Sequence, residues 1–473
     1  MVFRDQCDRG RPACTQCLNV NSECTGYRNA IDLMFEDETG IVTRKARSHV
    51  SKSVSSKRDN NPQALFPAPQ LQLLVDPPSV QAISFFTSAY SGGCYLDWLP
   101  SIYLSHKRSA SLEASFEAVA LSYMANQQQR GDLQILAQER YGVGLAQTMS
   151  LLTGHQSASP ETIASILLLA LFAVLSSESY QDAQSTWSKH VHGIVAILEP
   201  SSAPAIFDSS AGQSLLHHII SIVQIDCIQR GLPFPPYLKL LYSVSCLNEG
   251  YQAYFWILLD RLATLNSQFD EEQVSLSYIV KLEELEKEVE HLISSMPAAN
   301  PGHFSFQEIP NSHIVNGSIL QPFIPVQVFS GWRSAQAWNT LRMIRLYNNN
   351  LLRRSITGYL PPNAIPPETV DKLEMLLHHT SVVAYHTAVD MCATVPENLR
   401  PEYWSKDPDP DTSLHFSSWA RSLIWPLSLA EGSPHGSERL HEYLKRQIGV
   451  LGAITGMRGL HKKSTSLPTK DDW

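Results

Sequence analysis

The chain has 473 residues, of which 43% are hydrophobic and 17% charged, so most of it can bury a core. This length has room for roughly two or three domains. The formal net charge of −9 argues against a protein that is coated over its whole surface in nucleic acid. It leaves room for a small basic module at one end, so charge is considered segment by segment.

The cysteines are unevenly distributed, because four of the eight lie within the first 24 residues. They are Cys7, Cys14, Cys17 and Cys24, with the spacing C-x6-C-x2-C-x6-C. The N-terminus lacks the apolar core of a secretory signal, which disfavours a disulfide framework and favours metal binding. Zinc takes four tetrahedral ligands, and the two thiolates of a C-x2-C turn can both reach one ion. We therefore predict that residues 1–28 bind zinc through these four cysteines.

Residues 29–79 are predicted to form a linker that is basic in its middle and rich in proline towards its end. Its basic residues are Arg44, Lys45, Arg47, Lys52, Lys57 and Arg58, with no acidic residue from Thr43 until Asp59. Few large apolar residues accompany them, which favours disorder. Two interpretations stay open, a solvated tether or a nuclear import signal that also attracts DNA phosphate. The candidate residues for DNA binding or nuclear import are Arg9, Arg11, Arg44, Lys45, Arg47, Lys57 and Arg58.

Residues 80–460 are predicted to form one helical domain, followed by a tail at 461–473. Apolar residues at steps of three and four indicate a helix, namely Leu133, Ala137, Tyr141, Leu145, Met149 and Leu152. Ser159-Pro160 supplies an N-cap and a first-turn proline for the next helix. The apolar run from Ile163 to Leu175 is shorter than the roughly 20 residues of a membrane span, so we predict a buried helix in a soluble protein.

Two later helices complete the prediction. One carries a stripe of apolar residues and is expected to end at Met296-Pro297; the stripe is Tyr278, Leu282, Leu285, Val289 and Leu292. Another contains Trp338, Leu341, Arg342, Ile344 and Arg345 and is expected to stop around Asn348-Asn349-Asn350. Strand-like alternation bounded by hairpin turns is hard to find. The predicted fold class is therefore all-α, with one large multi-helical domain.

Three patterns could indicate an enzyme: His190 with His192, His378-His379 with Glu374, and Gly142 with Gly144. The first two histidines point to different faces of a helix, and no carboxylate motif accompanies them. The second pair lacks an HExxH motif, so exposed helix-surface histidines explain it better. The glycines lie inside a helical stripe rather than after a strand, which disfavours a dinucleotide site. We therefore predict that the chain is not an enzyme.

The segment CDRGRPACTQCLNVNSECTGYR resembles the latter part of the fungal zinc binuclear cluster, the six-cysteine motif of a transcription factor family. The matching positions are Cys7-Asp8, the loop proline Pro12, the pair Cys14 and Cys17, the last ligand Cys24, and Gly26-Tyr27. The family's first two cysteines, and the basic helix that reads base edges, have no counterpart ahead of Cys7. The resemblance therefore implies that a two-metal cluster cannot form as in the family. One zinc ion held by the four remaining thiolates is the arrangement left open.

The helical body carries weaker resemblances to the regulatory domain of the same family. They are the stretch from Gln138 through Tyr141, Leu145 and Met149; the segment with Trp187, His190, Gly193 and Leu198; and Trp425-Pro426-Leu427. The resemblance implies a nuclear regulator of RNA polymerase II genes, often those of a metabolic gene cluster. Its expected partners are promoter DNA and the transcription machinery, without a membrane. The alternative is a helical regulatory protein that binds protein partners without specific DNA binding.

Two further expectations follow from the resemblance. A homodimer is expected, but residues 29–43 lack the sustained heptad of the family's usual coiled coil. The match begins at Cys7 and continues in register through Tyr27, whereas a decaying domain would lose ligands at scattered positions. We therefore expect the missing half-motif to lie just upstream in the gene. A genuinely shortened regulator that competes for partners is the alternative.

Overall fold

The computed structural model describes most of the chain from residue 76 onward. The described ranges are 76–90, 96–105, 109–153, 159–198, 207–245, 250–309, 324–360, 366–395, 416–434 and 436–463. All of them belong to one unit of the chain, residues 72–473. The predicted zinc ligands and the basic linker lie outside the described residues, as do Cys94 and Cys246.

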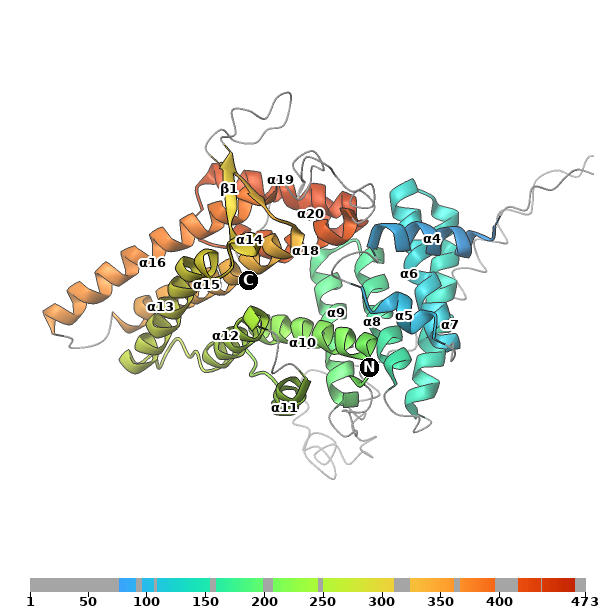
Figure 1. Ribbon diagram of the computed structural model, residues 1–473, viewed down its shortest axis with the longest axis horizontal. Helices are drawn as coiled ribbons and strands as arrows, with labels where there is room; N and C mark the ends of the chain where they lie inside the picture. The colour runs from blue at the N-terminus through green and yellow to red at the C-terminus, as the bar shows by residue number, and fades with distance from the viewer. Residues whose placement is uncertain are drawn as a thin grey trace, which may run out of the picture. The chain divides into compact units, whose positions relative to one another are not determined.

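The described residues form sixteen helices and two short strands (Figure 1). The helices are α4 (Pro78–Tyr90), α5 (Leu99–Tyr103), α6 (Ala110–Gln128), α7 (Gly131–Thr153), α8 (Pro160–Ser176), α9 (Tyr180–Leu198), α10 (Ser210–Arg230), α11 (Pro236–Ser245), α12 (Gly250–Ser267), α13 (Leu276–Ala299), α14 (Pro301–Phe304), α15 (Trp332–Tyr359), α16 (Pro367–Ala393), α18 (Phe416–Glu431), α19 (Glu438–Thr455) and α20 (Arg458–Lys463). The strands are β1 (Phe306–Ile309) and β2 (Val326–Phe329). The prediction of an all-α fold is confirmed.

The apolar helix α8 lies at the centre of the first group of helices, where it packs against α6, α7 and α9. Every residue from Thr162 to Phe172 is buried, which confirms the predicted buried helix. Its N-cap is also as predicted, because the Ser159 side chain accepts a hydrogen bond from the Thr162 N–H at 3.2 Å. Among the described residues, no helix combines the length and apolarity needed to cross a membrane.

Helices α6 and α7 pack closely because α7 has a glycine at their contact. A Cβ atom placed on Gly144 would lie 2.7 Å from Ser115 Oγ and 3.1 Å from the Ser115 backbone nitrogen. Both Gly142 and Gly144 lie inside α7, as the helical interpretation of this stretch predicts. Gly144 therefore serves close helix packing.

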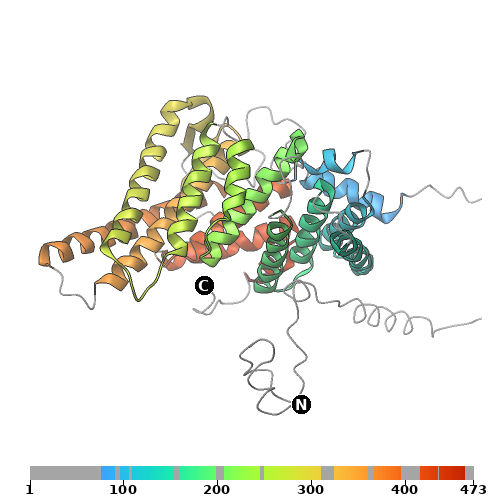
Figure 2. The ribbon, with the colours of Figure 1, turned by 90° about the horizontal axis from the view of Figure 1, so that it is seen from below.

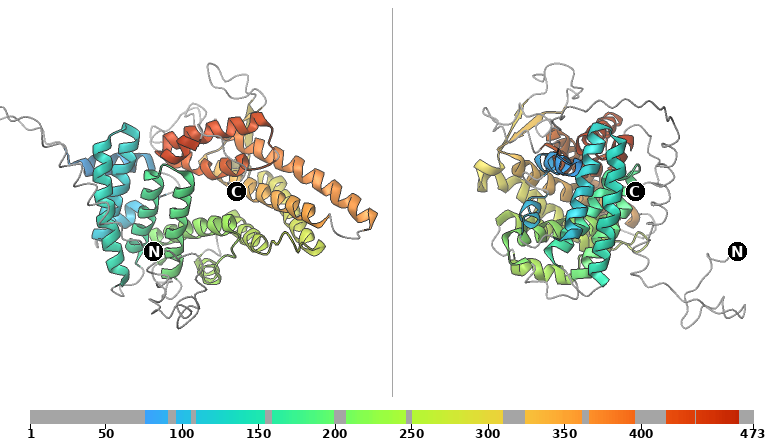
Figure 3. Two further views of the ribbon diagram at one scale, coloured as in Figure 1. Left: turned by 180° about the vertical axis from the view of Figure 1, so that it is seen from behind. Right: turned by 90° about the vertical axis from the view of Figure 1, so that its right-hand side faces the viewer.

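Helix α10 joins the first group of helices to the second, since it contacts α9 on one side and α12 on the other (Figure 3). In the second group, α15 packs against both α13 and α16 (Figure 2). Helix α18 contacts α15, α16 and α19, so the C-terminal helices close this part of the core.

The expected stop at the asparagine run was wrong, because α15 continues through it to Tyr359. Asn348 and Asn349 are fully buried. The Asn348 side chain donates to the Leu282 carbonyl of α13 at 3.0 Å. The Asn349 side chain donates to Glu286, also on α13, at 2.5 Å. Both amides therefore bind a neighbouring helix, and the Asn349 amide also donates to the Arg345 carbonyl of its own helix at 2.9 Å, so the two asparagines are accommodated within α15.

The expected end of α13 at Met296-Pro297 was also wrong, because the helix runs on to Ala299 with Pro297 inside it. The Asn300 N–H bonds to the Met296 carbonyl at 3.2 Å, so the last turn closes around the proline. A proline so near a helix end removes only one hydrogen bond.

A short antiparallel hairpin was not predicted. Strand β1 pairs with β2, with Phe306 opposite Phe329 and Ile309 opposite Val326. The hairpin is attached to α15 through Arg342, a buried residue that donates to the Gln327 side chain at 2.7 Å. At four residues each, the strands are too short for alternation to be visible in the sequence.

Candidate functional site

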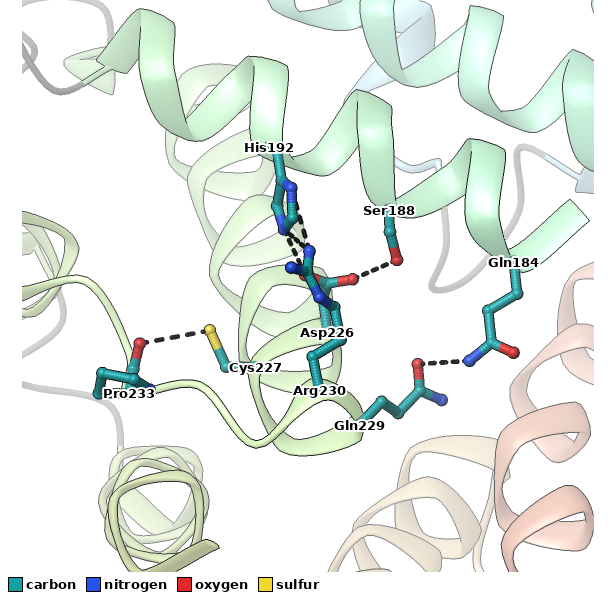
Figure 4. Close-up of polar contacts among 8 residues, drawn as sticks. All are labelled: Gln184, Ser188, His192, Asp226, Cys227, Gln229, Arg230 and Pro233. Carbon is teal, nitrogen blue, oxygen red and sulfur yellow. Dashed lines mark hydrogen bonds and ion pairs between the residues drawn. The ribbon is translucent and has the colours of Figure 1, made fainter. Parts of the chain in front are cut away.

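A cluster of polar side chains lies where α9 meets α10, around Asp226 (Figure 4). The Asp226 side chain is only 4% exposed. Ser188 Oγ donates to Asp226 Oδ1 at 2.5 Å, and His192 Nε2 lies 3.0 Å from Oδ2. Arg230 Nη1 forms an ion pair with Oδ2 at 3.7 Å. The buried carboxylate is thus compensated by one cation and two hydrogen-bonding groups.

The helical repeat explains how four residues converge on this point. Ser188 and His192 are one turn apart on α9, and Asp226 and Arg230 are one turn apart on α10, so each pair shares a helix face. The polar contacts continue along the same two helices, where the Gln184 amide lies 3.3 Å from Gln229 Oε1.

The order of contacts argues against acid–base catalysis by this cluster. In a nucleophilic triad the hydroxyl bonds to histidine and the histidine bonds to the carboxylate. Here Ser188 bonds directly to the carboxylate of Asp226, and Arg230 lies against the His192 ring. The cluster therefore fixes α9 to α10 and offers no activated nucleophile.

The histidine patterns of the sequence do not converge on a metal. Burial, with a smaller effect of Lys189, lowers the pKa of His190 to about 4, while His192 is engaged with Asp226. Glu374, His378 and His379 are exposed on α16. No group of three or more His, Cys, Asp or Glu side chains suited to a metal ion occurs in the part of the chain that the structure describes.

The two described cysteines, Cys227 and Cys392, are buried thiols, which is common for single cysteines in apolar stretches. Burial raises the pKa of Cys227 to about 12, and it raises the pKa of Cys392 as well. Since the thiolate is the metal ligand and the nucleophile, neither thiol suits those roles.

A second buried polar cluster joins α13 and α15. Glu286 is 5% exposed and lies 2.7 Å from Arg345 Nε, and it also accepts the hydrogen bond from Asn349. Burial raises the pKa of Glu286, while the Arg345 guanidinium acts in the opposite direction. The sequence analysis predicted neither cluster. The local signal that each one offers is a charged residue, Asp226 or Glu286, with apolar residues three or four positions away on the same helix.

Comparison with known families identifies the N-terminal segment. Residues 4–32 match the fungal Zn(2)-Cys(6) binuclear cluster domain. No curated protein and no solved structure matches the chain. The match supports a fungal zinc-cluster transcription regulator, and zinc is the metal that this domain binds. The family is one of DNA-binding transcription factors, which are generally not enzymes.

The donor atoms of the matched segment fit one zinc ion and not two. Residues 4–32 contain four cysteines, all of them among the predicted ligands. Four thiolates complete one tetrahedral zinc site. A second ion, as in the family's six-cysteine cluster, would find no further cysteine in this segment.

Proposed function

We propose that the chain is a nuclear regulator of RNA polymerase II genes that acts on promoter DNA through its N-terminal segment. The observation that carries this proposal is the coincidence of the family match at residues 4–32 with four cysteines at zinc-ligand spacing. Cys7, Cys14, Cys17 and Cys24 hold one zinc ion in this proposal. The zinc fixes the short segment, which has too few apolar residues for a core of its own.

The distribution of charge supports the assignment of DNA contact to the N-terminal segment. Residues 1–58 contain ten Lys and Arg against seven Asp and Glu, whereas residues 59–473 contain 26 against 38. An acidic body repels DNA, so phosphate contact falls to the basic residues near the N-terminus. These are Arg9, Arg11, Arg44, Lys45, Arg47, Lys57 and Arg58, which also serve nuclear import in this proposal.

The expected mode of binding follows from the residues that the segment contains. Base readout needs side chains at base edges, and phosphate contacts alone carry no sequence information. The basic residues assigned above lie mostly in the predicted linker, and this proposal gives them contacts to phosphate alone. The chain should therefore bind DNA weakly, with strong salt dependence and little sequence preference.

The experiment is fluorescence anisotropy of the full chain with duplex DNA across a series of salt concentrations. Substituting Arg44, Lys45 and Arg47 with glutamine should make the plot of log affinity against log salt less steep. The magnitude of its slope should fall by about 0.9 for each phosphate contact that is lost. The control neutralises three exposed basic residues of the body, Lys281, Lys287 and Arg446, and should leave the slope unchanged. Tight binding to one defined sequence at physiological salt would refute the proposed mode. No binding at all would favour the alternative, a helical regulator that acts through protein partners.

A further inference from the structure

Helix α15 carries two arginines, Arg342 and Arg345, that contact its neighbours α16 and α13. Arg345 Nε lies 2.7 Å from Glu286 on α13, and Arg342 Nη1 donates to the Asp390 backbone carbonyl on α16 at 3.1 Å. Arg342 is 3% exposed, and burial lowers its pKa to about 10, so it stays charged at neutral and acidic pH. Each of the two helix junctions therefore holds a cation.

Two outer carboxyls complete the surroundings of these arginines. Glu290 on α13 lies 3.7 Å from Arg345 Nη2. Glu308 on β1 accepts a hydrogen bond from the Gln327 side chain at 3.1 Å, and Gln327 in turn accepts one from Arg342 at 2.7 Å. We call this arrangement the α15 joint. Among the described residues it contains four carboxyls and two guanidiniums, namely Glu286, Glu290, Glu308 and Asp390 with Arg342 and Arg345.

The inner carboxyl on α13 is shielded from water. Glu286 is 5% exposed and accepts hydrogen bonds from Arg345 and Asn349. Burial raises the pKa of Glu286 and the nearby Glu290 adds to this rise, whereas Arg345 and Asn349 act in the opposite direction. The carboxyl therefore holds its proton more firmly when α13 is packed on α15 than when it is free in water.

The inner carboxyl on α16 is influenced by a similar set of groups. Burial raises the pKa of Asp390, and the Glu308 carboxylate acts in the same direction. Arg342, His386 and Arg345 oppose this rise. The two Arg342 hydrogen bonds given above go to neutral acceptors, a backbone carbonyl and an amide oxygen, and do not reach the carboxylate. Asp390 therefore also holds its proton more firmly in the packed joint than in water.

We propose that the α15 joint is a proton-sensitive latch, which its excess of carboxylates loosens near neutral pH and which tightens as the pH falls. With every carboxyl and guanidinium ionised, four negative charges oppose two positive ones, and protonation of the inner pair leaves two of each. The latch sets how firmly α13, α16 and the β1–β2 hairpin are held to α15. It involves neither zinc nor DNA, so it goes beyond the proposed function and is tested separately.

The first experiment measures amide hydrogen exchange of the full chain near pH 5 and near pH 7, corrected for the intrinsic exchange rates. A carboxyl whose pKa is one unit higher in the closed form shifts the opening equilibrium about tenfold across its titration. Exchange in α13, α15 and the hairpin should therefore slow at least about threefold at the lower pH. Unchanged or faster exchange in these elements would overturn the proposal.

The second experiment compares two double variants that carry the same chemical changes. Glu286→Gln with Asp390→Asn removes the inner carboxyls, so exchange in α13 and α15 should lose most of its pH dependence and stay slow near pH 7. Glu374→Gln with Asp371→Asn makes the same changes at exposed positions of α16 and should keep the wild-type response. A wild-type response in the first variant, or its loss in the second, would show the proposal to be wrong.

Single substitutions keep the test decisive if the first double variant does not fold. Glu286→Gln and Asp390→Asn should each remove part of the response, and a full response in both would contradict the latch. His386→Gln separates the exposed histidine of α16 from the carboxyls and should retain most of the response. A complete loss in that variant would assign the pH dependence to His386 and overturn the role of the inner pair.

Discussion

Gly142 and Gly144 lie two residues apart on α7 and offer a matched pair of substitutions with opposite expected effects. A Cβ on Gly142 meets no atom within 4 Å. A Cβ on Gly144 would lie 2.7 Å from Ser115 Oγ, 3.1 Å from its nitrogen and 3.3 Å from its Cα. Ser115 is fully buried on α6, so a Cβ at position 144 would meet a packed neighbour that a Cβ at position 142 does not meet.

The magnitudes follow from two opposing contributions. Alanine is favoured over glycine in a helix interior by about 1 kcal/mol. Gly142→Ala should therefore raise the free energy of unfolding by about 0.5–1 kcal/mol. At Gly144 the same gain is opposed by about 1–3 kcal/mol of overpacking, because the close atoms include backbone that cannot rotate away. The difference between the two contributions predicts that Gly144→Ala lowers the free energy of unfolding by up to about 2 kcal/mol.

Urea unfolding followed by circular dichroism measures both variants against the wild-type chain. The midpoint should rise for Gly142→Ala and fall for Gly144→Ala with little change in slope. Since the chemical change and the helix are the same, Gly142→Ala controls for helix propensity. Equal stabilisation by both substitutions would refute the close approach of α6 and α7 at Ser115.

Three further predictions concern the capped and buried polar groups. Asp226→Ala should lower the free energy of unfolding by about 2 kcal/mol. This is less than the loss expected for a fully buried ion pair, because the side chains of Arg230 and His192 are 39% and 40% exposed and regain water. Chemical denaturation measures the loss, with Glu139→Ala at an exposed position as the control, and an unchanged free energy of unfolding would contradict the prediction. Because burial raises the pKa of Glu286 above its ordinary value of 4.5, the folded state binds the proton more tightly than the unfolded state. Wild-type stability should therefore fall relative to Glu286→Gln as the pH rises from 4.5 towards neutral, and parallel pH profiles would count against it. Ser159→Ala should lower the free energy of unfolding by about 1 kcal/mol, because α8 loses its N-cap. Thermal melting measures the loss, with Ser150→Ala at an exposed position of α7 as the control.

The sequence predicted those helices whose signals are local. The stripe from Leu133 to Leu152 and the cap at Ser159 depend on residues a few positions apart, and α7 and α8 were found where expected. The end of α15 could not be predicted in this way. Asparagine usually favours a helix end, and at Asn348 and Asn349 that tendency is reversed by partners on α13. These partners lie more than 60 positions away and become neighbours only in the folded chain.

The functional residues also divide into those with a signal in neighbouring positions and those brought together only by the fold. The cysteine spacing is contained in 18 consecutive positions from Cys7 to Cys24, so the sequence alone shows a ligand set and the family match agrees with it. The Asp226 cluster draws on two helices whose residues are 34 to 38 positions apart. An aspartate in the apolar stretch IISIVQIDCI signals a buried partner, but its identity comes only from the structure.

Zinc held by the N-terminal cysteines is the property on which the proposed function depends most directly. Elemental analysis of the purified full chain should find one zinc ion per chain. Changing Cys7, Cys14, Cys17 and Cys24 to serine should remove it, while Cys227→Ser, a change at a buried thiol, should leave it in place. Equal zinc content in the four-serine variant and the wild-type chain would contradict the proposed ligands.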